Sequence, residues 1–447
     1  MAAPRPLSGF PELLPEQRVV EQHVLDVLRH TFELYGFAGL ETRAVEPLSV
    51  LLRKGEIDKE VYAVRRLHAE PVEGEAADDT LALHYDLTVP FARYVLENAG
   101  RLQFPFRRYQ IQKVWRGERP QEGRYREFLQ ADIDVVDRDG LAQHHDVEMA
   151  RVMLDALSRL PLPGVRLQVN NRKLIEGFYR GLGIDDAAGV MRVVDKLDKV
   201  GAEEVARQLR EDVRLDERQS AACLALPSAS GPDAGFADRV RALGVEHPLL
   251  EEGLTELLAV LEGCADLRSE RVEVVADLSV ARGLDYYTGT VYETRLTGHE
   301  HLGSICSGGR YDSLASDGTT TYPGVGISFG VTRALAPLLQ RGLLSASRSV
   351  PTCVVVAVVD EERRAASDAV AAALRARGVP TEVSPTAAKF GKQIRYADRR
   401  GVPFVWFPQD DGSHQVKDIR SGEQAEADPA SWQPPAADLR PSVGTAG

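Results

Sequence analysis

Residues 105–136 read PFRRYQIQKVWRGERPQEGRYREFLQADIDVV, two runs of strand-forming residues separated by a charged turn that contains a proline and a glycine. The pattern predicts a β-hairpin. Because side chains alternate between the two faces of a strand, Arg116 shares one face of the first strand with Val114 and Gln112. In the second strand one face carries Arg126, Phe128, Gln130, Asp132 and Asp134. Polar groups therefore gather on a face that should belong to the core.

A solvated sheet surface is the ordinary interpretation of such a face. The local charge favours a different one, because residues 101–126 hold eight Lys or Arg and two Glu, whereas the whole chain of 447 residues has a formal charge of −13. The acidic total argues against nucleic-acid binding through bulk positive charge. A basic segment inside an acidic chain is better explained by local phosphate binding.

The rest of the chain is long enough for two or three domains. Apolar residues at helical spacing predict a helix from Glu16 to Tyr35, which Gly36 ends. Residues 169–261 are mainly helical in pattern, residues 272–296 alternate as strands, and a glycine-rich strand passes into a helix near Val331. Strands and helices then alternate in the last hundred residues, which predicts a small α/β domain after a linker near residues 345–351.

The cysteines and the N-terminal residues indicate in which compartment of the cell the protein is expected. The four cysteines lie far apart without a CxxC pair, which speaks against a zinc site or a disulfide framework and favours a reducing cytoplasm. The first 17 residues contain no apolar segment of a signal peptide, and no apolar run is long enough to cross a bilayer. We expect a cytoplasmic protein without a membrane span.

Two further motifs complete the pattern. Residues 281–290 read ARGLDYYTGT, and residues 304–312 read SICSGGRYD. Together with the charged hairpin, the segment GVGISFGVTRAL and the terminal α/β domain, they give a specific signal, because four motifs follow in one order. The chain resembles the histidyl-tRNA synthetases, a family of class II aminoacyl-tRNA synthetases, over nearly its whole length.

The resemblance implies an α+β fold in which helices flank an antiparallel catalytic sheet. It places the first part of the catalytic domain at residues 1–168, a helical insertion at 169–265 and the second catalytic part at 266–345. An anticodon-binding α/β domain follows at 351–447. A homodimer is expected, although Arg43 stands where class II enzymes usually carry the proline of their dimer-forming motif.

The implied reaction is the ATP-dependent ligation of L-histidine to its tRNA through histidyl-adenylate, with release of AMP and pyrophosphate. Negative charge gathers on the α-phosphate in the transition state, so fixed cations would do most of the catalysis. By resemblance Arg116 and Arg282 are the catalytic pair. The ATP-binding residues implied are Arg116, Glu118, Arg124, Phe128 and Arg333. Mg²⁺ should arrive with ATP, and no dedicated protein metal site is expected.

The implied histidine site comes from three segments of the chain. Asp86 and Thr88 match the residues that hold the α-amino group, and Tyr287 and Asp134 match those that meet the two ring nitrogens. Gln130 and Tyr286 complete the set. Such a site rejects analogues because its buried polar groups would be left unpaired. For the GGRYD segment we expect structural support rather than ligand contact, with Arg310 and Asp312 as a possible internal ion pair.

Two alternatives stay open. Lys389, Lys392, Arg395, Arg399 and Arg400 lie on or near one predicted helix of the terminal domain, where tRNA contact competes with a plain solvated face. A synthetase-like paralogue without activity, serving as a histidine-sensing regulatory subunit, is the rival function. The intact arginines, Tyr287 and the terminal domain favour the enzyme.

Overall fold

The computed structural model describes residues 5–54, 60–68, 80–280, 287–409 and 411–445. The chain divides into two compact units, one made of residues 1–11 and 25–337 and the other of residues 12–24 and 338–447. The division after residue 337 falls inside helix α12 (Val331–Gln340), earlier than the linker expected near residues 345–351. The helix expected from Glu16 is α1 (Pro15–Leu34), and Gly36 follows it with a positive φ of 78°.

The hairpin predicted from the charged segment is present. Strands β5 (Phe106–Trp115) and β6 (Glu127–Val136) are antiparallel, with Gln112 opposite Gln130 and Val114 opposite Phe128. The two polar faces expected for the separate strands therefore form one continuous face. Gln130, Asp132 and Asp134 are at most 8 % exposed, so a solvated sheet surface is excluded.

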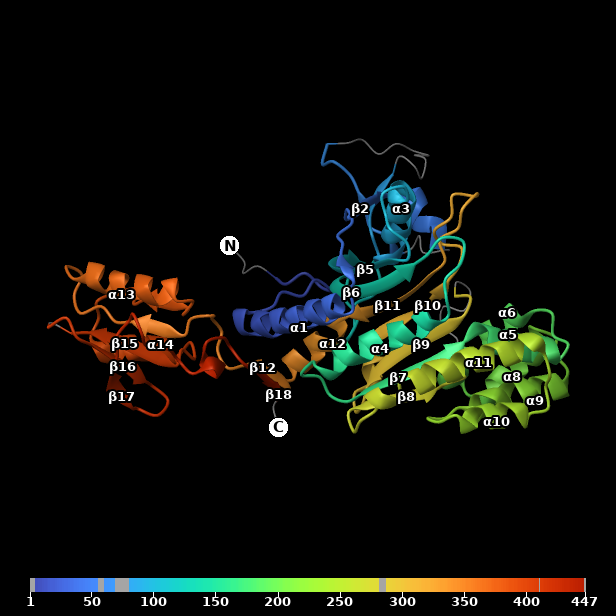
Figure 1. Ribbon diagram of the computed structural model, residues 1–447. Helices are drawn as coiled ribbons and strands as arrows, with labels where there is room; N and C mark the ends of the chain where they lie inside the picture. Colours follow the sequence, from blue (N-terminus) through green and yellow to red (C-terminus); the bar gives the residue numbers. More distant parts are fainter. Residues whose placement is uncertain (1–4, 55–59, 69–79, 281–286, 410, 446–447) are drawn as a thin grey trace. The chain divides into compact units, whose positions relative to one another are not determined.

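This hairpin belongs to an eight-stranded sheet in the order β1-β5-β6-β11-β10-β9-β7-β8 (Figure 1). The remaining strands are β1 (Ala38–Gly39), β7 (Val165–Asn171), β8 (Val272–Ala276), β9 (Thr290–Leu296), β10 (Cys306–Tyr311) and β11 (Gly324–Gly330). Neighbours are antiparallel except in the two outermost pairs, β1 with β5 and β7 with β8. The order brings residues from both halves of the unit to the centre of one sheet.

Helices cover one face of this sheet. Helix α4 (His144–Ser158) packs on β6 and β11, and α11 (Pro248–Gly263) packs on β7 and β8 (Figure 1). From β9, Tyr292 points to this side, where its hydroxyl donates to the Asp146 carbonyl at 2.7 Å. Because strand residues alternate, the neighbouring Glu293 lies on the opposite face, which is the polar one.

The helical segment expected at 169–265 differs at its start, because residues 169–171 are the end of strand β7. Its helices are α5 (Arg172–Gly181), α6 (Ala187–Val194), α7 (Leu197–Val200), α8 (Ala202–Glu211), α9 (Glu217–Ala225), α10 (Gly235–Arg241) and α11. Helices α5 and α11 cross at glycines: a Cβ at Gly253 would come within 2.2 Å of the Leu174 nitrogen. The last helix of the segment is thus part of the layer that covers the catalytic sheet.

A small sheet in the order β2-β4-β3 precedes helix α3 (Thr88–Asn98). Its strands are β2 (Val45–Pro47), β3 (Ala63–Val64) and β4 (Leu81–Leu83), and α2 (Leu48–Leu51) follows β2. Asp86 lies between β4 and α3, and its carboxylate accepts a hydrogen bond from the Val89 nitrogen at 3.1 Å. This bond ties the loop that carries Asp86 to the first turn of α3, which begins at Thr88.

The second unit contains the strand and helix alternation predicted from the sequence. Parallel strands β13 (Val354–Val356), β14 (Thr381–Val383) and β15 (Phe404–Pro408) alternate with α13 (Arg364–Ala376) and α14 (Phe390–Asp398). Two antiparallel strands, β16 (His414–Asp418) and β17 (Gln424–Glu426), extend the sheet and were not predicted, because they are short and polar. A separate antiparallel pair joins β12 (Leu344–Ala346) to β18 (Val443–Thr445).

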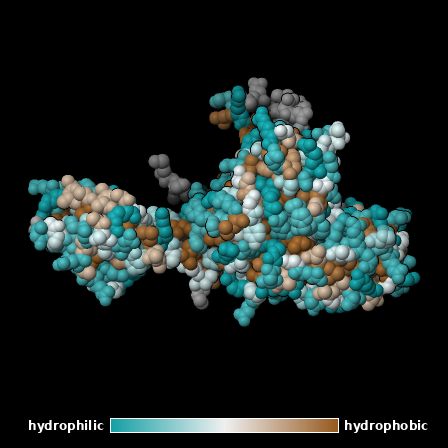
Figure 2. Space-filling view, in the orientation of Figure 1, coloured by the Kyte–Doolittle hydropathy of each residue, from teal (hydrophilic) through white to brown (hydrophobic). Residues whose placement is uncertain are grey.

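The face visible in Figure 2 is mainly hydrophilic, with hydrophobic side chains scattered among polar ones. Within the described ranges, no helix is both long and apolar enough to span a bilayer.

Candidate active site

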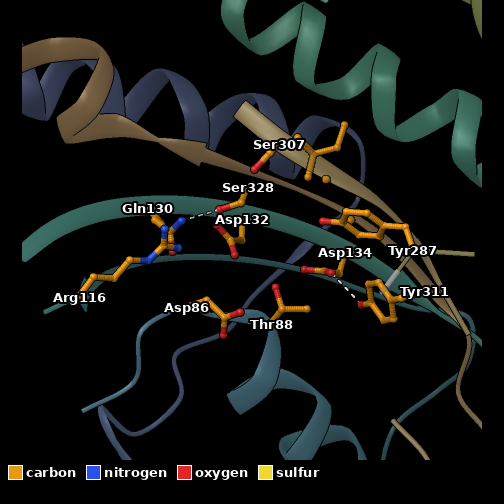
Figure 3. A pocket seen from close by; sticks show the side chains of 13 residues that line it. Asp86, Thr88, Arg116, Gln130, Asp132, Asp134, Tyr287, Ser307, Tyr311 and Ser328 are labelled. Atoms are coloured by element: carbon orange, nitrogen blue, oxygen red, sulfur yellow. Dashed lines mark hydrogen bonds between the residues drawn. The ribbon is translucent and has the colours of Figure 1, made fainter. Parts of the chain in front are cut away.

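A pocket opens on the polar face of the eight-stranded sheet (Figure 3). Its empty space, part of it open to solvent, is about 470 Å³. Its lining is Asp86, Thr88, Arg116, Gln130, Asp132, Asp134, Tyr287, Ser307, Gly308, Tyr311, Gly326, Ile327 and Ser328. The sheet supplies one wall, and Asp86 of the loop before α3 and Thr88, the first residue of α3, lie on the opposite side (Figure 3).

One end of the pocket is built around Asp134. Its two carboxylate oxygens are held by different partners: Arg108 forms an ion pair at 2.6 Å, and the Tyr311 hydroxyl donates at 2.8 Å. Arg108 is fully buried, lies over the Phe91 ring at 4.4 Å and also donates to the Leu87 carbonyl at 3.3 Å. Asp134 is therefore a fixed carboxylate whose charge has a buried counter-ion.

Asp132 lies one step along the same strand face and has a different environment. The Ser328 hydroxyl donates to it at 2.5 Å, and the Gln130 amide nitrogen donates to the Ser328 oxygen at 3.0 Å. Burial, which outweighs the attraction of Arg108, raises the pKa of Asp132 to about 7, and the nearby Asp134 carboxylate adds to the increase. The carboxyl is thus only marginally charged at neutral pH.

Tyr287 closes the pocket from the β9 and β10 side. Its ring lies against Gly309, where a Cβ would come within 2.8 Å of two ring carbons. Burial, followed by the charges of Asp134, Asp86 and Asp132, raises the pKa of Tyr287, so its hydroxyl keeps its proton. A glycine is required at 309 because any side chain would displace this ring.

The opposite end of the pocket is cationic. The Arg116 Nε donates to the Tyr85 carbonyl at 3.0 Å, and its guanidinium lies 5.1 Å from the centre of the Phe128 ring. In the adjoining turn Arg124 pairs with Glu118 at 3.2 Å. The contacts with Tyr85 and Phe128 hold the Arg116 guanidinium in place.

Arg333 approaches the same turn from helix α12. Its Nε and Nη2 donate to the Leu302 carbonyl at 3.1 and 2.7 Å, in the short helix η5 (Glu300–Leu302). A Cβ placed on Gly123 of the hairpin turn would lie 3.5 Å from that same carbonyl oxygen. The turn, η5 and Arg333 therefore meet beside the cationic end of the pocket.

Comparison with known proteins identifies this arrangement. The family model for histidyl-tRNA synthetase matches residues 9–334, and the model of an anticodon-binding domain matches residues 352–430. The chain belongs to the histidyl-tRNA synthetase family. It is 60 % identical to the histidine–tRNA ligase of Cutibacterium acnes, with 99 % of both chains covered, and 61 % identical to that of Micrococcus luteus, with 98 % of both covered.

Solved structures agree with the family assignment. The crystal structure of histidyl-tRNA synthetase from Nostoc sp. PCC 7120 is 34 % identical, covers 96 % of this chain and 97 % of its own, and superposes with a TM-score of 0.83. A Bacillus halodurans structure titled as an ATP phosphoribosyltransferase regulatory subunit or histidyl-tRNA synthetase is 21 % identical, with a TM-score of 0.70 over 88 % of this chain and 96 % of its own. The second likeness shows the fold alone. The α+β class II fold with an anticodon-binding domain is confirmed.

The structure gathers most of the residues that the histidyl-tRNA synthetase motifs singled out. Five of the six expected for histidine line the pocket together with Arg116: Asp86, Thr88, Gln130, Asp134 and Tyr287. Those expected for ATP lie beside its cationic end, namely Glu118, Arg124, Phe128 and Arg333. Arg282 and Tyr286 lie outside the described residues. The individual roles stay predictions.

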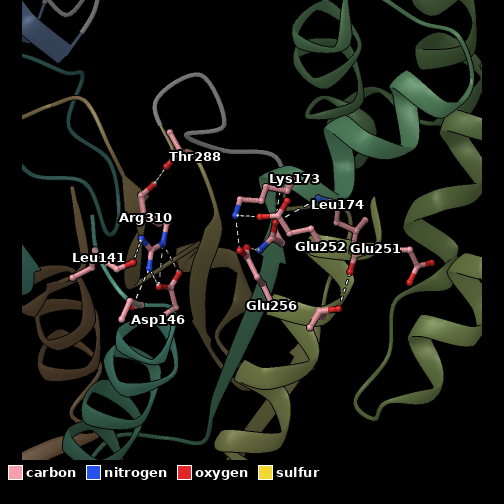
Figure 4. A network of polar contacts seen from close by, with 12 residues as sticks. Leu141, Asp146, Lys173, Leu174, Glu251, Glu252, Glu256, Thr288 and Arg310 are labelled. Carbon is pink, nitrogen blue, oxygen red and sulfur yellow. Dashed lines mark hydrogen bonds and ion pairs between the residues drawn. The ribbon is translucent and has the colours of Figure 1, made fainter. Parts of the chain in front are cut away.

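Sequence reasoning missed part of the site and erred on one motif. Tyr311 and Gly308 of the GGRYD segment line the pocket, so this segment does more than support it. Arg310 pairs at 2.5 Å with Asp146 of α4, not with Asp312 (Figure 4). The alternation of strand residues explains the different places of two neighbours, because it sends Tyr311 to the pocket face and Arg310 to the helical face.

The described residues contain no group of three or more His, Cys, Asp and Glu placed to hold a metal ion.

Proposed function

We propose that the pocket binds L-histidine beside the α-phosphate of ATP, with Arg116 at the reacting centre. The chain is a histidine–tRNA ligase, which joins L-histidine to its tRNA through histidyl-adenylate. The observation that carries the proposal for the site is the meeting of Asp86, Thr88, Gln130, Asp134 and Tyr287 with Arg116 in one pocket. Carboxylates and hydroxyls at one end suit a cationic amino acid, and the guanidinium at the other end suits a phosphate.

In the first step a carboxylate oxygen of histidine attacks the α-phosphorus of ATP. A new phosphorus–oxygen bond forms, the bond to the bridging oxygen breaks, and pyrophosphate leaves with the electron pair. Arg116, held by the Tyr85 carbonyl, would stabilise the added charge without reorganising. In the second step a ribose hydroxyl at the 3′ end of the tRNA attacks the activated carbonyl, and AMP leaves.

For ATP itself, Phe128 would stack on the adenine and Arg333 would cover its other face. Arg124 is paired with Glu118 in the structure. When ATP binds, Arg124 would leave this partner and bind the β- and γ-phosphates, and Glu118 would accept from the adenine amino group. We propose that ATP enters as its Mg²⁺ complex, in which the cation offsets phosphate charge. Arg282, matched to the other side of the reacting centre, is proposed as the second catalytic cation on the motif alone.

The terminal unit is proposed to contact the anticodon stem and loop. Lys389, Lys392, Arg395 and Arg399 are all exposed along α14, whereas Arg400 is half-buried and paired with Glu382. The exposed row is the more suitable surface for tRNA phosphates. Of the five basic residues considered for tRNA contact, Arg400 is therefore left out and the other four are kept.

A homodimer and a cytoplasmic location are further proposals. Leu34 at the end of α1 is 60 % exposed, and strand β1 after it is exposed as well, in the region matched to the dimer-forming motif. The mass of the protein in solution tests the dimer. The four cysteines are buried and free, which suits a reducing compartment.

Histidine-dependent exchange of pyrophosphate into ATP, without tRNA, tests the proposed function. A ligase gives exchange with histidine, whereas a regulatory paralogue would bind histidine without exchange.

A further inference from the structure

The hydrogen bonds around Asp132 leave acceptors turned toward the pocket. The Gln130 amide nitrogen donates a hydrogen bond to the Ser328 hydroxyl oxygen, and the Ser328 hydroxyl donates to one carboxylate oxygen of Asp132. Among the residues that the structure describes, the Gln130 amide oxygen is buried without a hydrogen-bond partner. Within these ranges, the hydrogen bond from Ser328 engages one carboxylate oxygen of Asp132. The Gln130 amide oxygen is therefore a buried acceptor without a donor, which is costly unless a ligand provides one. Asp132, two residues along β6, presents a second acceptor on the same strand face.

In the part of the chain that the structure describes, Arg116 is the one cation that lines the pocket. Asp86 and Thr88 stand across the pocket (Figure 3), and Asp86 adds a second carboxylate. Arg108 attracts Asp132 but already pairs with Asp134 at 2.6 Å. Arg116 is oriented at the far end by the Tyr85 carbonyl. The middle of the pocket is thus rich in acceptors and negative charge, and it calls for a positively charged group with several N–H donors.

We propose that Asp132 is a further substrate-binding residue, whose carboxylate is the counter-ion of the histidine α-ammonium group, with the Gln130 amide oxygen as the second acceptor. This inference rests on the proposed function. An ammonium has three N–H donors, which would match Asp132, Gln130 and Asp86. The imidazole ring then occupies the end formed by Asp134, Tyr287 and Tyr311. Asp132 and Asp134 are two residues apart on one strand face, about 6.6 Å at roughly 3.3 Å per residue, so each serves a different end of the amino acid.

The raised pKa of Asp132 agrees with this geometry. Burial makes its charged form costly in the protein alone, and the Asp134 and Asp86 charges add to the cost. A bound ammonium would remove that cost, so the pocket gains most from a ligand that carries one. A neutral or acidic ligand of the same shape would gain nothing from Asp132.

The test is equilibrium binding by calorimetry at pH 7.5 with two ligands, L-histidine and 3-(imidazol-4-yl)propionate, which lacks the ammonium. Asp132→Asn keeps the shape and an acceptor for Ser328 but removes the charge. We expect it to weaken histidine binding about 100-fold and to change binding of the propionate less than threefold. Asp134→Asn, at the ring end, is the matched variant and should weaken both ligands.

Other outcomes overturn the inference. If Asp132→Asn weakens the binding of both ligands equally, Asp132 contacts the imidazole ring or stabilises the fold. If it weakens the binding of neither ligand, Asp132 is not the counter-ion of the ammonium group. Should the asparagine variant fail to fold, Asp132→Ser is expected to give the same split between the ligands, and an equal loss for both would again overturn it. Failure of the wild-type protein to bind histidine would instead contradict the proposed function.

Discussion

Arg108 and Asp134 lie directly opposite each other on β5 and β6 and form an ion pair at 2.6 Å, with both side chains almost completely buried. Two adjacent strands thus place a fixed negative charge at one end of the pocket together with its own cation. Asp132, two residues away, is attracted by the same arginine, but no ion pair of its own is present among the described residues. The electrostatics of the pocket follow from this difference.

Replacing Arg108 should destabilise the protein strongly. Arg108→Gln leaves the Asp134 charge buried without its cation, and we expect a loss of about 3–5 kcal/mol in the free energy of unfolding. Urea denaturation of the catalytic unit measures this loss. As the control, Arg207→Gln breaks an exposed pair with Glu204 and should leave the midpoint unchanged. Equal midpoints for wild type and Arg108→Gln would show that the buried pair does not hold the strands together.

The raised pKa of Asp132 predicts a pH-dependent stability in the absence of substrates. With a pKa of about 7 in the folded protein and 3.8 when unfolded, the folded state holds a proton that the unfolded chain has lost between about pH 4 and 7. Stability contributed by this group therefore falls as the pH rises through that window. Asparagine does not titrate, so Asp132→Asn should melt a few degrees above wild type at pH 8, with a smaller gain at pH 5. A wild type that melts higher than the variant at pH 8 would contradict the assignment.

Gly309→Ala should displace Tyr287. The added Cβ would lie 2.6 Å from the Thr290 carbonyl oxygen and 2.8 Å from the tyrosine ring, closer than carbon atoms can approach, so the ring must shift. Because misplacement by about 1 Å can cost 100-fold, we expect the KM for histidine to rise at least tenfold. At Gly100 no atom lies within 4 Å of an added Cβ, so Gly100→Ala is the matched control and should keep the wild-type KM. Unchanged KM values in both variants would remove Tyr287 from the histidine site.

Arg116→Ala should lower the rate of adenylate formation about 100- to 1,000-fold, because a fixed cation at the developing charge is removed. The rate of pyrophosphate exchange at saturating substrates measures this effect. Arg101→Ala, an exposed arginine of the same basic segment, should keep the wild-type rate. Near-normal exchange by the Arg116 variant would exclude it from the reacting centre.

Local pattern was sufficient for the parts of the site that come from one segment. Strand alternation placed Gln130, Asp132 and Asp134 on a single face, and the hairpin register then set Arg108 opposite Asp134. The charge contrast of residues 101–126 separated this face from an ordinary solvated one. The same pattern could not rank Asp132 against Asp134, because their difference depends on which strand contributes an arginine and which a serine.

Contacts between segments far apart in the sequence could not be predicted from local sequence pattern. Tyr311 reaches Asp134 because β11 and β10 follow β6 in the sheet, an order that no short stretch of residues specifies. The pairing of Arg310 with Asp146 spans 164 positions and depends on α4 covering the sheet. The sequence neighbour Asp312 was the wrong partner, because it is not on the helix that packs there.

Exchange of pyrophosphate into ATP, measured with each standard amino acid and no tRNA, tests the central claim most directly. The arrangement of the pocket predicts exchange with histidine alone, since only histidine combines an ammonium for the acidic middle with a ring that meets Asp134 and Tyr287. A folded sample that binds histidine but gives no exchange with any amino acid would contradict the proposed chemistry, as would equal exchange with several amino acids.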